Sequence, residues 1–112
     1  LQSFVTLNDE AYVEFAQALA RRIYTEGGNL TVDRLKFALR LTLAKPVEAR
    51  RLAALTELFN GELAYYQERP DAAKELFGKT VPLPPGASLR EMAALTVVAN
   101  VLLNLDSILM KG

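Results

Sequence analysis

The stretch SLREMAALTVVANVLLNLDSILM, residues 88–110, decides the fold of this chain. Its first four residues match a capping box, in which a serine and a glutamate satisfy the free amide groups at the start of a helix. The residues that follow are apolar on almost every side of a helix, which is typical of the buried helix at the centre of a bundle. We therefore expect a central helix over residues 89–109. Asn100 and Asn104 keep its apolar stretches well below the ~20 residues of a membrane span, and we expect no membrane span.

Three earlier stretches have the apolar spacing of amphipathic helices. We expect them to cover residues 8–26, 31–45 and 47–68. Asn8 and Thr31 are suitable N-caps for the first two. The pair Gly27-Gly28 tolerates the positive φ that ends a helix, and Pro46 separates the second helix from the third.

The spacing also predicts which side chains of these helices face inward. In the first helix they are Tyr12, Phe15, Ala16, Leu19 and Ile23, with Glu10, Glu14, Gln17 and Arg21 on the opposite side. In the third they are Leu52, Leu55, Phe59, Leu63 and Tyr66. Gly61 lies inside the third helix, where glycine costs about 1 kcal/mol relative to alanine, so we expect a close backbone neighbour or a bend there.

Pro70 precedes a short helical segment, residues 71–77, and residues 79–87 hold three prolines and a glycine. That composition favours an extended surface loop. No alternating strand pattern is found along the chain. The sequence therefore predicts an all-α fold: a single domain over residues 1–112, an irregular bundle of four main helices and one short one around the C-terminal helix.

Composition excludes several kinds of site. The 112 residues contain no histidine and no cysteine, so a Ser-His-Asp triad, a thiol nucleophile and a c-type haem attachment cannot be built from this chain alone. Thirteen basic residues balance thirteen acidic ones, and the two signs are mixed along the sequence. We therefore expect no cofactor in this segment and no nucleic-acid partner.

Two features of the N-terminus lead us to interpret the chain as an excised piece of a longer protein. It starts with Leu1 in place of methionine, and no charged segment followed by an apolar one marks a signal peptide. The oligomeric state cannot be predicted from these observations.

Three segments carry a family resemblance: LQSFVTLNDE (1–10), RLKFALRLTLAKP (34–46) and VLLNLDS (101–107). In this order they resemble the C-terminal part of a planctomycete-specific domain of cytochrome-c-associated multidomain proteins, domain of unknown function fifteen fifty-three. The resemblance covers nearly the whole chain, and its most specific pieces are residues 7–9 and 104–106. Lys45 stands where family members often have arginine.

The resemblance implies a context and no activity. The proteins of that family are large and usually exported, and they carry haem-attachment modules upstream of this region. It therefore implies an exported or periplasmic bacterial protein whose upstream domains in the same chain contact this segment.

Asp106 is the first candidate functional residue, because the end of a helix disfavours a negative charge. Its expected partner is Arg40, Arg21 or Arg22, in a structural ion pair or hydrogen bond. The alternative is a carboxylate presented to a ligand or to the upstream domains.

Thr96, Asn100, Asn104 and Ser107 form a narrow uncharged polar stripe on the last helix. The simpler interpretation is that this stripe faces water, and the alternative is a polar contact with another protein. Asn8 is accounted for as an N-cap. A local excess of basic side chains is expected to form a solvated face, with anion binding as the alternative: Arg34, Lys36, Arg40, Lys45, Arg50 and Arg51.

Three function hypotheses follow. The first is a non-catalytic helical module that has a structural or interaction role within a larger protein. The second is a tetratricopeptide-like binding unit, because residues 65–77 resemble one junction of that repeat, although no second copy is visible. The third is a segment that contributes Asp106, Asn104 or Arg40 to an active site held by upstream domains.

Overall fold

The computed structural model describes the backbone of residues 10–43, 48–79 and 81–111, and side chains within 13–42, 48–79 and 81–104. Over these ranges the chain is all-α, as predicted. The elements are α1 (Glu10–Glu26), α2 (Thr31–Leu43), α3 (Ala49–Gln67), α4 (Pro70–Ala73), the π-helical turn η2 (Lys74–Gly78) and α5 (Leu89–Lys111). The predicted N-cap Asn8 and the predicted start of the third helix at residue 47 lie outside the described residues.

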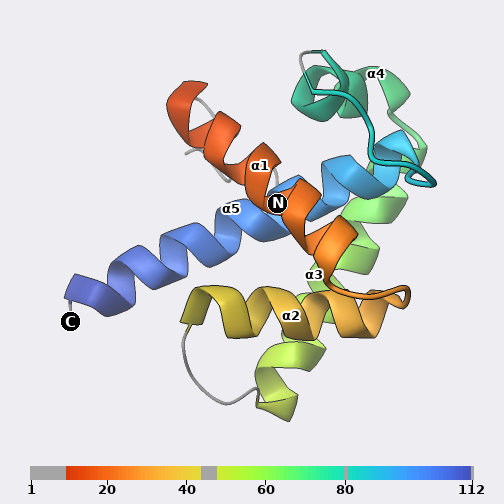
Figure 1. Cartoon of the computed structure of the whole chain (residues 1–112). Coiled ribbons are helices and arrows are strands. Elements are labelled where there is room, and N and C mark those ends of the chain that lie inside the picture. The colour runs from red at the N-terminus through yellow and green to blue at the C-terminus, as the bar shows by residue number, and fades with distance from the viewer. Residues whose placement is uncertain (1–9, 44–47, 80, 112) are drawn as a thin grey trace.

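α5 is the central helix of the bundle, which confirms the sequence prediction. It packs against α1, α2, α3, α4 and η2, and Figure 1 shows it running across the molecule behind α1. Its side chains from Met92 to Asn100 are all buried. Other helices complete the core around it with Ala16, Ala20, Ile23, Leu35, Ala38, Leu39, Leu55, Phe59 and Phe77.

The predicted capping box starts α5. The backbone amide of Glu91 donates to the Ser88 hydroxyl oxygen at 3.2 Å, and the backbone amide of Ser88 donates to the Glu91 carboxylate at 3.2 Å. Two amide groups without helical partners are thereby satisfied. These bonds fix where the proline loop ends and the central helix begins.

α1 buries nearly the side that was predicted, since Ala16 and Ile23 are 0% exposed, but two residues beside that side are exchanged. Phe15, expected in the core, is 68% exposed, and Gln17, expected outside, is only 7% exposed. The Gln17 side-chain amide donates to the carbonyl oxygen of Leu76 in η2 at 2.7 Å. The small residues Ala16 and Ala20 lie on the same buried side, facing the core. The helix is therefore turned slightly from the predicted orientation, so that Gln17 faces inward and the phenyl ring of Phe15 faces out.

The turn between α1 and α2 contains a glycine with positive φ, as predicted. The N-cap of α2 is not the predicted residue. Gly28 has φ of +108°, the left-handed conformation that glycine adopts without strain. α2 begins at Thr31 itself, and the Leu30 carbonyl accepts the backbone amide of Arg34 at 3.0 Å. The residue in the cap position is thus Leu30, one residue before the predicted Thr31.

α3 follows the predicted inward pattern, with one correction and one addition. Leu55, Phe59 and Tyr66 are buried. Gly61 is exposed, and a Cβ atom added there would meet nothing within 4 Å. Of the two expectations for Gly61, the close backbone neighbour is therefore wrong, and the bend stays a prediction. The addition is Glu62, which lies in the buried stripe of α3 and is 6% exposed.

Candidate functional site

The first half of the polar stripe on α5 lies inside the molecule, whereas Asn104 is partly exposed and the side chain of Ser107 lies outside the described residues. Thr96 and Asn100 are each 0% exposed, so the expectation that they face water or another protein is wrong. The Thr96 hydroxyl donates to the Met92 carbonyl at 2.7 Å, and the Asn104 side-chain amide donates to the Asn100 carbonyl at 3.1 Å. A short polar side chain that bonds the preceding turn can be buried at little cost. These bonds give Thr96 and Asn104 a structural role.

Asp106 and Asn8 cannot be placed, because the side chain of Asp106 and the whole of Asn8 lie outside the described residues. The expected partners of Asp106 can be placed in part. Arg40 is exposed in the last turn of α2. An ion pair between Asp106 and Arg40 stays a prediction.

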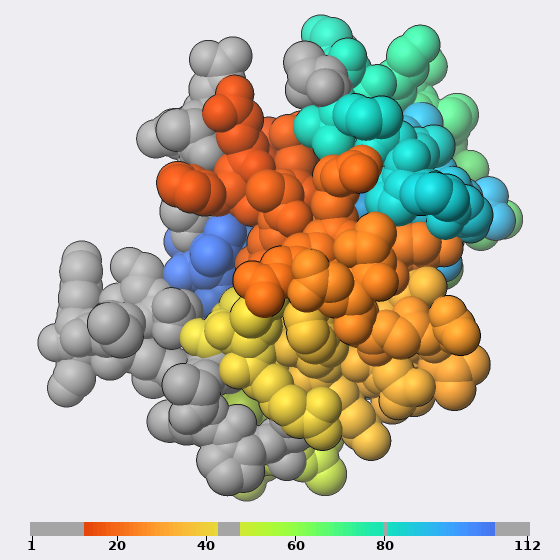
Figure 2. All heavy atoms as spheres, viewed as in Figure 1, coloured from red at the N-terminus to blue at the C-terminus, as the bar shows by residue number. Residues whose placement is uncertain are grey.

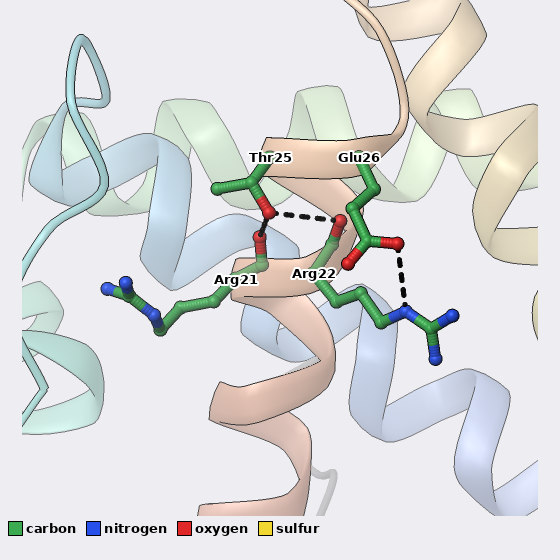
Figure 3. A network of polar contacts seen from close by, with 4 residues as sticks. All are labelled: Arg21, Arg22, Thr25 and Glu26. Carbon is green, nitrogen blue, oxygen red and sulfur yellow. Dashed lines mark hydrogen bonds and ion pairs between the residues drawn. The ribbon is translucent and has the colours of Figure 1, made fainter.

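The other two expected partners, Arg21 and Arg22, make contacts elsewhere. Figure 3 shows the Arg22 Nε atom paired with the Glu26 carboxylate at 3.2 Å, with Arg21 extending away from that pair. Arg21 donates a hydrogen bond to the Pro82 carbonyl of the proline loop. The Thr25 hydroxyl donates to the Arg21 carbonyl at 2.8 Å, within the last turn of α1. Of these contacts, the Arg21 bond joins the end of α1 to the proline loop, and the other two lie within α1.

The basic residues do not act as one group. Arg34 lies over the ring of Tyr24, 3.7 Å from its centre, and its Nε atom donates to the Tyr24 carbonyl at 3.1 Å. Arg51 lies 3.4 Å from the Glu48 carboxylate, one turn away. Arg40 and Arg50 are exposed. The side chains that the structure describes therefore fit the solvated face better than a shared anion site.

The feature best suited to binding is an apolar hollow between α2, α3 and α5. Its volume is about 330 Å³, and we call it the aliphatic hollow; it is lined by Leu39, Arg51, Ala54, Leu55, Leu58, Val101 and Leu102. Leu39, Leu55 and Leu102 are buried and form its floor, whereas Ala54 is exposed at its edge. Arg51 is the charged residue among these lining positions. An apolar hollow with one charged group has the composition of a binding site.

The hollow was not predicted, because it depends on three helices that are distant in sequence. One signal was available. Arg51, Ala54, Leu55 and Leu58 recur at helical spacing along α3, and Ala54 is the small member of that series. A small residue among leucines leaves room above a packed floor.

Sequence reasoning also missed a buried carboxyl group. Glu62 lies one turn after Phe59 and one turn before Tyr66, both of which are buried. Its Oε1 atom has no hydrogen-bond partner among the described residues, and burial raises the pKa of this carboxyl above its ordinary value. Burial, helped by the nearby Glu62 and Tyr65, raises the pKa of Tyr66 to about 12. The spacing of Glu62 within the apolar stripe was the signal that could have revealed it.

Within the described ranges, no group of three or more acidic residues has the arrangement of a metal site. In the same part of the chain, no helix is long and apolar enough to cross a membrane. Comparison of the chain with protein-family models, with curated proteins and with solved structures finds no match. The resemblance to the planctomycete domain, and the exported location that it implies, stay predictions.

Proposed function

We propose that this chain is a non-catalytic interaction module that binds a helix of another polypeptide through the aliphatic hollow. The sequence supports the first half of the proposal, because it offers neither histidine nor cysteine for acid-base, nucleophilic or metal chemistry. The hollow supports the second half, because its lining, in the part of the chain that the structure describes, presents apolar surface.

The hollow is the single observation that carries the proposal. Its floor of Leu39, Leu55 and Leu102 is already packed, so a ligand gains contact with an ordered apolar surface. Covering such a surface with one large apolar side chain stabilises a complex by about 1.5–3 kcal/mol. Helix-in-groove recognition uses this kind of contact, repeated along one face of the bound helix.

Arg51 indicates the charge of the partner. It lines the hollow, and its side chain is 37% exposed. Its ion pair joins it to Glu48, the N-cap residue of the same helix, and is exposed, so it is weak. A partner helix with an acidic residue next to its apolar anchor would place a carboxylate beside this guanidinium. Such a pair selects and orients the partner more than it adds affinity.

Thiol labelling tests the proposal, because the chain contains no cysteine of its own. Ala54→Cys places a thiol in the hollow, and Ala53→Cys places one on the neighbouring exposed position outside the lining. Maleimide labelling rates are compared in the dilute 112-residue chain, in the concentrated chain and in the full-length gene product. We expect equal rates in the dilute chain and slower labelling, by about tenfold or more, of Ala54→Cys alone wherever the partner is present. Equal rates for both variants in all three samples would refute the proposal.

A further inference from the structure

We infer that the helix bound in the aliphatic hollow is α1 of a second copy of this chain, with Phe15 as its anchor. The inference rests on the proposed function, since it names the partner of the same site. Two independent features of the described residues lead to it: an apolar side chain exposed on one surface and an apolar hollow on another.

Phe15 is the exposed feature. It is 68% exposed, more than any other large apolar side chain in the described ranges. Figure 2 shows α1 on the outer face of the molecule, between α2 and the proline loop. Ala18, one turn further along α1, is also exposed. A phenyl ring beside a small residue can enter a hollow without a clash from the helix that carries it.

The aliphatic hollow has room for this ring. An apolar cavity of ~150 Å³ holds a benzene molecule, and the hollow measures about 330 Å³. Its floor is leucine, and the exposed Ala54 lies at its edge. The volume of the hollow therefore admits the ring of Phe15 from another copy.

The charges beside these two features are complementary. Glu14 precedes Phe15 and is exposed on α1. Arg51 lines the hollow and is engaged only by the exposed contact to Glu48 among the ion pairs of the described residues. When Phe15 enters the hollow, Glu14 can approach Arg51. This pairing of an acidic residue and an aromatic anchor on α1 matches the partner chemistry that Arg51 indicates, and it is why we favour a second copy.

Sedimentation equilibrium of the 112-residue chain tests the inference. The contact is small, so we expect a weak association with a dissociation constant on the order of 100 µM. Phe15→Ala removes the anchor and Ala54→Trp fills the hollow, and each is expected to weaken association by about tenfold or more. Ala53→Trp is the matched control and should associate as the wild type does. Thermal melting verifies that the variants are folded, which we expect because Phe15 and Ala54 are both exposed.

Three results would overturn the inference. They are a wild-type chain that stays monomeric up to about 1 mM, an association that survives Phe15→Ala, and one that survives Ala54→Trp in folded protein. The proposed function is tested separately by the labelling of Ala54→Cys. If the chain is monomeric but Ala54→Cys is protected in the full-length gene product, the hollow binds a different partner and only the second copy is excluded.

Discussion

Replacing Gly61 by alanine should stabilise the protein. Gly61 lies in the interior of α3 and is exposed, and apart from the backbone of its own helix nothing lies within 4 Å of the position that a Cβ would take. The substitution therefore adds no packing and causes no clash. What remains is the difference in helix propensity, about 1 kcal/mol in favour of alanine. For a domain of this size, that gain raises the melting temperature by roughly 5 °C.

Urea unfolding followed by circular dichroism measures this gain. The midpoint should rise by about 0.5–1 M with an unchanged slope. Ala53→Gly, also exposed in α3 and about two turns away, should cause an equal loss. The double variant should return to wild-type stability, since separated sites add. Gly27→Ala should instead destabilise, because its Cβ would lie 2.5 Å from the Ile23 carbonyl oxygen and 2.8 Å from the Arg34 Cα. A Gly61→Ala midpoint at or below that of the wild type would refute the reasoning.

Three further predictions concern polar groups. Burial raises the pKa of Glu62 above 4.5, so the folded state holds the proton of this carboxyl more tightly than the unfolded state does. The free energy of unfolding should therefore fall as the pH rises from about 4.5 through this raised pKa. Glu62→Gln should remove that fall in urea titrations across pH, whereas Glu57→Gln, exposed on the same helix, should retain it; parallel profiles for both variants would contradict the assignment. Ser88→Ala should cost about 1 kcal/mol by removing the cap of α5, and unchanged thermal unfolding would show that the capping box contributes nothing. Gln17→Ala should also cost about 1 kcal/mol, since the Leu76 carbonyl loses its donor, and amide exchange should accelerate in η2 more than in α3.

The central helix was predictable because two local signals agree there. The capping box at Ser88 and Glu91 fixes its start, and the apolar residues on every side require burial whichever neighbours surround them. The proline loop was predictable for a similar reason, since proline lacks the amide that a helix needs. Neither inference requires knowledge of tertiary contacts.

The orientation of α1 was not predictable, because helical spacing locates a buried stripe only to within about one residue, or 100°. Phe15 and Gln17 lie on either side of Ala16, so each could join the stripe. The decision depends on the Leu76 carbonyl, which is 59 residues away in sequence and accepts the Gln17 amide. Glu62 shows the opposite situation: its spacing predicts burial, whereas its charge predicts exposure.

The orientation of α1 also bears on its partner. The turn that buries Gln17 exposes Phe15, and leaving a phenyl side chain in water in place of burying it forgoes about 1.5–3 kcal/mol. The hydrogen bond from Gln17 to the Leu76 carbonyl contributes only about 1 kcal/mol to the stability of the fold. Within a single copy, the exposed ring is therefore not compensated by that bond alone. A contact that covers Phe15 would recover the difference, which is why the binding experiment should begin with this side chain.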